Sequence, residues 1–140
     1  MNSIELFSGT GGLALGLQQA GFDHKALFEW DKASCENIKE NIANGYPGVR
    51  DWKVYQTDVR TVNYNGYTGS IQLVAGGPPC QPFSLGGKHQ AYNDKRDMFP
   101  EAVRAVRETQ PEAFIFENVK GLLRKSFSSY FNYIPVSYTH

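Results

Sequence analysis

Short apolar runs alternate with amphipathic stretches along most of this chain. The runs are bounded by turn residues, as buried strands are, and we expect strands at residues 3–7, 26–30, 54–55, 71–75 and 113–116. Apolar side chains recur at helical spacing between them, which predicts helices over residues 13–20, 32–44 and 97–109 and a last amphipathic piece over 119–134. This order favours an α/β fold with a mostly parallel sheet and flanking helices on both faces.

Three details refine this pattern. Asp31 stands where its side chain can cap the helix over 32–44. Cys35 falls at helical spacing with Ile38, so we expect its thiol to pack in the core. Residues 81–96 are polar and show no period, and such a segment is either disordered or a functional lid.

Length and composition limit the number of domains, the partners and the cellular compartment that we expect. With 140 residues the chain is long enough for one domain with a real core. Lys plus Arg and Asp plus Glu both total 14, so no net positive field draws the chain to nucleic acid. The two cysteines give neither a disulfide framework nor a metal-type spacing. No signal peptide or membrane-spanning stretch is evident, and we expect a cytoplasmic protein with no membrane partner.

Polar and glycine-rich features follow the predicted strands. They are Ser8–Gly12, Glu29, Asp58, Cys80 and Glu117. The carboxyl ends of parallel strands meet at one edge of the sheet, where ligands of such folds bind. The sequence therefore predicts an active site at that edge.

The first of these features has the residues of a nucleotide site. Gly9, Gly11 and Gly12 permit a tight turn and a close approach of a ligand to the backbone, before a helix whose first amides are free. Glu29 follows Gly9 at a spacing where a carboxylate can accept hydrogen bonds from ribose hydroxyls. Trp30 offers a flat surface for a purine. On these residues alone, dinucleotide cofactors stay open as ligands.

Residues 76–84 read Gly-Gly-Pro-Pro-Cys-Gln-Pro-Phe-Ser and place Cys80 directly after a strand, between prolines. Proline fixes φ and restricts the residue before it, so the backbone that carries the thiol is stiff. A nucleophile needs such a mount, because it must be held within attack distance of its target. This run resembles the catalytic motif of the DNA (cytosine-5) methyltransferases.

Further segments are similar to the same family, in the family's order. The resemblance implies a Rossmann-like methyltransferase fold, S-adenosylmethionine as cofactor, S-adenosylhomocysteine as product, and no metal. Residues 7–13 look like the cofactor loop, Glu29 and Trp30 like the segment that binds ribose and adenine, and Asp58 like the residue that meets the adenine amino group. The cofactor-binding residues implied are Phe7, Ser8, Gly9, Thr10, Gly11, Gly12, Leu13, Glu29, Trp30, Asp58, Val59, Pro78 and Met98.

The resemblance also implies a mechanism. The Cys80 thiolate adds to C6 of a cytosine, C5 then takes a methyl group, and loss of the C5 proton releases the cysteine. Glu117 begins a segment similar to the family's acidic catalytic motif and would donate a proton to N3 of cytosine. We expect burial beside the apolar run 113–116 to raise the pKa of this carboxyl, because desolvation disfavours its charged form.

Residues 81–96 resemble the family's mobile catalytic loop, which closes over DNA after the target base leaves the stack. Lysine, arginine and histidine make the segment locally basic, as contact with phosphates requires. The residues implied to contact double-stranded DNA are Gln81, Ser84, Lys88, Gln90 and Arg96.

We interpret residues 1–134 as the N-terminal part of the catalytic domain of a restriction–modification DNA methyltransferase, truncated before any target-recognition domain. Residues 135–140 look like a tail foreign to the family. We expect the chain alone to be inactive and to bind DNA weakly. Two alternatives stay open: a non-catalytic S-adenosylmethionine-binding fragment or subunit of a split enzyme, and an RNA cytosine-5 methyltransferase. An aromatic cluster also predicts self-association through uncovered apolar surface: Phe127, Tyr130, Phe131 and Tyr133.

Overall fold

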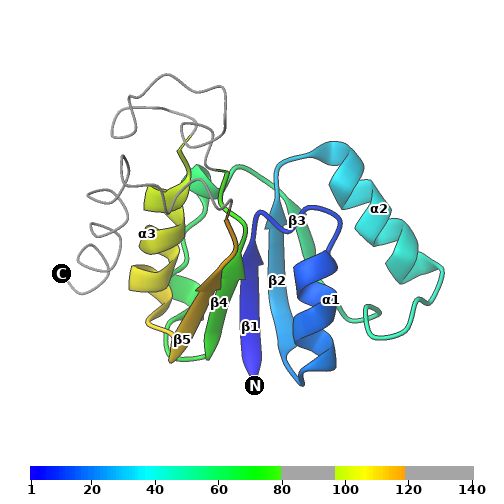
Figure 1. Ribbon diagram of the computed structural model, residues 1–140, viewed down its shortest axis with the longest axis horizontal. Coiled ribbons are helices and arrows are strands. Elements are labelled where there is room, and N and C mark those ends of the chain that lie inside the picture. The colour runs from blue at the N-terminus through cyan, green and yellow to red at the C-terminus, as the bar shows by residue number, and fades with distance from the viewer. Residues whose placement is uncertain (80–96, 119–140) are drawn as a thin grey trace.

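The computed structural model describes residues 1–79 and 97–118. In this part of the chain, five strands form one parallel sheet in the order β3-β2-β1-β4-β5 (Figure 1). They are β1 (Asn2–Leu6), β2 (Asp23–Glu29), β3 (Val54–Gln56), β4 (Leu73–Gly76) and β5 (Ala113–Phe116). The predicted α/β fold with a parallel sheet is confirmed.

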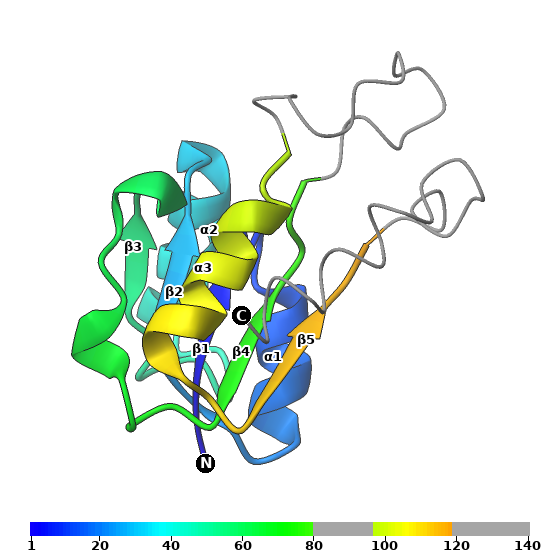
Figure 2. The ribbon, with the colours of Figure 1, turned by 90° about the vertical axis from the view of Figure 1, so that its left-hand side faces the viewer.

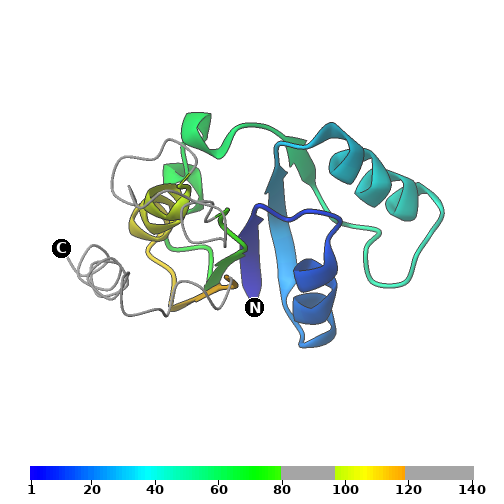
Figure 3. The same cartoon turned by 45° about the horizontal axis from the view of Figure 1, so that its top comes forward.

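Helices connect the strands and cover both faces of the sheet. They are α1 (Gly12–Gln19), α2 (Lys32–Ala43) and α3 (Phe99–Thr109), with two short 3-10 turns, η1 (Val59–Thr61) and η2 (Asn65–Tyr67). Figure 2 and Figure 3 show α3 on one side of the sheet and α1 on the other. Within residues 1–79 and 97–118, no helix has the length and apolar character needed to cross a bilayer.

Each face of the sheet has its own core. The α3 side is made of apolar residues from three strands and the helix: Ile4, Leu6, Ala26, Phe28, Val74, Ala105 and Val106. The other side consists of Ala14, Leu27, Ile38, Val49 and Trp52, with a second group of Leu17, Leu73 and Ala75. Neighbouring residues of one strand, such as Leu27 and Phe28, thus pack in opposite layers.

The two predictions for single residues near α2 are confirmed. The backbone N–H of Ser34 donates to Oδ2 of Asp31 at 2.7 Å, so Asp31 caps the helix. Cys35 is fully buried against the sheet. Its sulfur has a structural place in the core, and burial raises the pKa of its thiol.

β2 begins at Asp23, earlier than the predicted start at residue 26. The extension passes through His24, a polar residue that is nevertheless buried. Its ring nitrogens lie 3.0 Å from the hydroxyl of Ser3 and 2.8 Å from the carbonyl oxygen of Ala14. Because both nitrogens have partners, the imidazole can occupy a core position that hydropathy alone assigns to solvent.

The other bounds agree with the prediction within one or two residues, and the largest of these differences are at the starts of α3 and β4. α3 begins at Phe99 and not at residue 97, because Asp97 stays outside the helix and accepts a hydrogen bond from the Phe99 N–H at 3.1 Å. β4 begins at Leu73 and not at residue 71, a shift within the usual variation of element ends.

β5 forms where predicted but is not buried. Phe114 and Ile115 are 36% and 48% exposed. Among the described strands, β5 pairs only with β4 and lies at the edge of the sheet. An apolar run therefore identified the strand correctly, but it did not place the strand in the interior.

Glu5 is a carboxyl group in the middle of β1 and is 1% exposed. It accepts a hydrogen bond from the backbone N–H of Ala14 in the first turn of α1, where the N-cap residue, Gly11, has no side chain to do so. Within the described residues, its Oε2 atom has no partner. Burial raises the pKa of Glu5 to about 8, although the Ala14 N–H opposes the shift.

This shift predicts a pH-dependent stability. The folded chain holds a proton on Glu5 that the unfolded chain, with a pKa of 4.5, releases. The stabilising contribution is therefore complete below pH 4.5 and is lost as pH rises to about 8, with a slope of up to about 1.4 kcal/mol per pH unit. Glu5→Gln, neutral at every pH, should flatten this fall in the free energy of unfolding, measured by urea denaturation at several pH values. Glu40→Gln, on the exposed side of α2, should keep the wild-type slope, and equal slopes for Glu5→Gln and wild type would contradict the assignment.

Candidate cofactor and active site

A cavity of about 600 Å³ opens at the carboxyl ends of the strands, at the top of the sheet in Figure 1. Residues that follow four different strands contribute to it, together with one residue before α3. It is lined by Phe7, Phe28, Glu29, Trp30, Asp58, Val59, Arg60, Gly77, Pro79 and Met98. The edge predicted from the sequence is thus where the structure has its candidate site.

The loop between β1 and α1 is a tight turn. The N–H of Gly11 donates to the carbonyl oxygen of Ser8 at 2.8 Å. Phe7 has φ 56° and Gly11 has φ 88°, both in the left-handed region. A Cβ on Gly11 would also lie 3.0 Å from the Trp52 ring. Glycine is therefore required at position 11 by backbone conformation and by packing.

Glu29 ties this loop to the end of β2. Its Oε2 accepts the backbone N–H of Gly9 at 2.7 Å. Its Oε1 accepts the backbone N–H groups of Trp30 at 2.9 Å and Asp31 at 2.7 Å. One carboxylate thus satisfies three backbone donors from two segments, which fixes the loop relative to the cavity.

Asp58, Arg60 and Trp30 form the polar rim of the cavity. The Nε atom of Arg60 lies 2.9 Å from each carboxylate oxygen of Asp58, Nη2 also donates to Oδ2, and the Arg60 backbone N–H donates to Oδ1 at 3.0 Å. These contacts lower the pKa of Asp58, chiefly through the side-chain hydrogen bond, so the group is a carboxylate. The guanidinium lies 6.0 Å from the centre of the Trp30 ring.

Arg104 in α3 anchors the turn that carries Asp58. Its Nη2 donates to the carbonyl oxygen of Val59 at 2.7 Å, and its Nη1 donates to that of Val62 at 2.9 Å. Glu101 and Glu108 flank the same guanidinium at 2.8 and 2.9 Å. Helix α3 therefore holds in place the turn that carries Asp58.

The structure brings together part of the predicted cofactor set. Phe7, Glu29, Trp30, Asp58, Val59 and Met98 all line the cavity. The lining does not include Ser8, Gly9, Thr10, Gly11, Gly12, Leu13 and Pro78, although Gly9 adjoins the cavity through its bond to Glu29. Sequence reasoning did not assign Phe28, Arg60, Gly77 and Pro79 to the cofactor set, although the last two belong to the motif of residues 76–84. Phe28 belongs to an apolar run, and nothing in the pattern around Arg60 marks the direction of its side chain.

Glu117 follows β5 at the same edge. Its backbone N–H donates to the carbonyl oxygen of Gly76 at 2.9 Å, and a Cβ on Gly77 would lie 3.2 Å from its Oε2. The expected burial beside residues 113–116 is wrong, because both that strand and the Glu117 side chain are exposed. Cys80 and the predicted loop residues Gln81, Ser84, Lys88, Gln90 and Arg96 lie outside the described residues.

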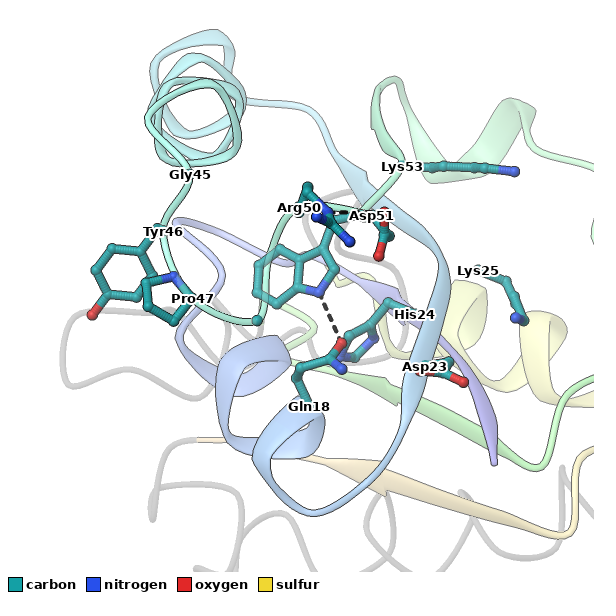
Figure 4. Close-up of a pocket in the computed structure, with 12 residues that line it drawn as sticks. Gln18, Asp23, His24, Lys25, Gly45, Tyr46, Pro47, Arg50, Asp51 and Lys53 are labelled. Atoms are coloured by element: carbon teal, nitrogen blue, oxygen red, sulfur yellow. Dashed lines mark hydrogen bonds and ion pairs between the residues drawn. The ribbon is translucent and has the colours of Figure 1, made fainter.

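A second cavity of about 600 Å³ lies beside α1 and the start of β2. Two pairs of its polar groups contact each other: the Trp52 indole N–H donates to Gln18 at 3.1 Å, and Arg50 lies 3.7 Å from Asp51. Figure 4 shows Lys25 and Lys53 extending away from Gln18. This cavity lies at the start of β2, whereas parallel α/β sheets bind ligands at the carboxyl ends of their strands, so the strand-end cavity is the candidate site. Among the described residues, no group of three or more His, Cys, Asp or Glu could hold a metal ion.

Comparisons with known proteins find similar sequences over most of this chain. A family model described as C-5 cytosine-specific DNA methylase matches residues 1–137. The type II methyltransferase M.NgoMIV of Neisseria gonorrhoeae is 46% identical over 132 residues, which are 94% of this chain and 40% of that protein. The type II methyltransferase M.PspPI of Psychrobacter sp. (strain TA137) is 43% identical over 120 residues, 85% of this chain and 27% of that protein. The chain thus spans well under half the length of these relatives.

Solved structures show the same fold. A crystal structure of an E. coli prophage protein, described as a DNA modification methyltransferase, is 32% identical with a TM-score of 0.74 and covers 99% of this chain and 38% of its own. A DNMT2 of Spodoptera frugiperda is 19% identical with a TM-score of 0.65, over 98% of this chain and 41% of its own. The latter likeness extends to the fold alone.

The role of Glu29 as an anchor is testable. Glu29→Ala leaves three backbone N–H groups without their acceptor and should lower the free energy of unfolding by about 1–3 kcal/mol. Amide hydrogen exchange should also become faster at Gly9. Glu36→Ala removes an exposed carboxylate paired with Lys32 and should cost less than about 0.5 kcal/mol without affecting Gly9. Unchanged exchange at Gly9 in Glu29→Ala would show that the carboxylate does not hold the loop.

Proposed function

The chain belongs to the C-5 cytosine-specific DNA methylase family, and from this premise we propose that it forms the cofactor-binding and catalytic part of a DNA cytosine-5 methyltransferase. The proposed reaction transfers a methyl group from S-adenosylmethionine to C5 of cytosine. The similarity to type II methyltransferases supports a place in restriction and modification.

The observation that carries this proposal is the convergence of Phe7, Glu29 and Asp58 on one cavity from the ends of three neighbouring strands. The cavity, of about 600 Å³, falls within the usual size range for small-molecule and cofactor sites. It combines apolar walls with carboxylates at its rim, as an adenosine needs. Ser8, which follows the lining residue Phe7 but does not itself line the cavity, has a buried hydroxyl oxygen with no partner among the described residues.

The donor and acceptor count at Glu29 fits a ribose. A carboxylate has about four acceptor sites, and three of them receive backbone N–H groups. The remaining site, on Oε2, can accept from one ribose hydroxyl. Glu29 therefore has two tasks, which are to hold the glycine loop and to bind the sugar.

Apolar and aromatic side chains suit the adenine ring. Phe7, Val59 and Met98 would contact its faces, and Trp30 would lie at its edge or face near the rim. Asp58, as an ionised carboxylate, would accept from the exocyclic amino group. When bound, the cofactor supplies an electrophilic methyl group.

The chain's own residues would activate the cytosine. The Cys80 thiolate would add to C6, which makes C5 nucleophilic, and would leave again when a base removes the C5 proton. Glu117 would hold a proton at N3 of the ring while the thiolate adds. Its position after β5, close to Gly77 at the start of the Cys80 segment, supports this role.

We assign double-stranded DNA as the substrate, with Gln81, Ser84, Lys88, Gln90 and Arg96 as its contacts from the loop. Reading of the target sequence would require a part of the protein beyond the residues matched here, since these cover 40% or less of the relatives above. The division at residue 134 and self-association through apolar surface remain predictions.

Radiolabelled methyl transfer to DNA tests the chemistry. Cys80→Ser should abolish transfer, because a serine hydroxyl is a far weaker nucleophile than a thiolate. It should leave binding of S-adenosylhomocysteine unchanged, because the described cavity is built without residue 80. Intact binding with no transfer by the wild-type chain would assign it a cofactor-binding role alone. Equal transfer by Cys80→Ser and wild type would overturn the proposed mechanism.

A further inference from the structure

Both oxygens of the Asp58 carboxylate bind one arginine in this structure. Oδ1 accepts the backbone N–H of Arg60, Oδ2 accepts its Nη2–H, and the single Nε–H is shared between the two oxygens. Three N–H groups thus contact a carboxylate that offers about four acceptor sites. An amino group from a ligand would therefore compete with the guanidinium for Asp58.

The same guanidinium also lies over Trp30. Its central carbon lies 6.0 Å from the centre of the indole ring, at the outer limit of a cation–π contact. With Arg60 in this position, Trp30 is still 67% exposed. Arg60 thus binds an acceptor and lies near an aromatic surface, both of which an adenine at this rim would use.

Arg60 is free to leave this position. The Asp58 and Arg60 side chains are 24% and 46% exposed, so water can replace the contacts that a departing guanidinium loses. The turn itself does not depend on the side chain, because the cap of η1 is the bond from the Arg60 backbone N–H to Asp58. Arg104 anchors the same turn from the other side.

We propose that Arg60 is a displaceable occupant of the adenine subsite, which holds the place of the ligand amino group on Asp58 and so sets the affinity for adenine-bearing ligands. This inference rests on the proposed function. Arg60 acts through Asp58, as a positioning residue. In the free protein, the Arg60 guanidinium pairs with the Asp58 carboxylate. When a ligand binds, its amino group replaces the guanidinium as the N–H donor to Asp58.

The exchange predicts that removal of the arginine strengthens binding. S-adenosylhomocysteine is a suitable probe, because it lacks the sulfonium charge that an unpaired carboxylate would attract. By calorimetric titration of the chain at low salt, Arg60→Ala should bind it about two- to fivefold more tightly than wild type, the worth of an exposed ion pair. The gain should shrink at high salt, where the ion pair of the wild type is screened.

Arg50→Ala is the matched control, because Arg50 also pairs with a neighbouring aspartate on the surface but lines the other cavity. It should bind with wild-type affinity. In an Asp58→Ala background, Arg60→Ala should bring no gain, because the two substitutions act on one interaction.

Weaker or unchanged binding by Arg60→Ala, or a gain that persists without Asp58, would overturn the inference and leave the proposed function standing. Absence of binding by wild type and Arg60→Ala alike, in folded protein, would contradict the proposed function itself and the inference with it. Binding by Arg60→Ala alone would support both.

Discussion

The bond between the Glu29 carboxylate and the Gly9 N–H joins two neighbouring strand ends, and the rest of the site is built around it. A loop with left-handed residues has little preference for one shape without such an anchor. Trp30 and Asp31 donate to the same carboxylate. A single side chain therefore holds the glycine loop, the backbone of Trp30 at the rim and the residue that caps α2.

Residues on the two faces of the sheet support different parts of the site. On one face, Trp52 packs against Gly11 and leaves no room for a larger residue in the loop. On the other face, Arg104 of α3 fixes the turn that carries Asp58. Both supports lie outside the cavity, so its polar rim is held by groups that need not move when a ligand enters. Among the described residues, the Arg60 side chain, by contrast, contacts Asp58 and Trp30 of the rim itself.

The alternation of apolar runs predicted the five strands and three helices of the described residues, because short apolar runs mark strands and apolar side chains at helical spacing mark helices. Glu29 and Asp58 could be placed at the cavity, since they follow strands. Other properties depend on partners far away in the sequence. The burial that raises the pKa of Glu5 to about 8 comes from tertiary packing, and the occupation of Asp58 by Arg60 depends on a side-chain direction that no period encodes.

Amide hydrogen exchange of the chain with and without S-adenosylhomocysteine tests the central claim most directly, which is that the strand-end cavity is the cofactor site. Bound ligand should slow exchange at Gly9, at Trp30 and across residues 58–60, while residues 45–53 around the second cavity keep their rates. Protection confined to residues 45–53, or no protection at any amide of a folded chain at saturating ligand, would contradict it.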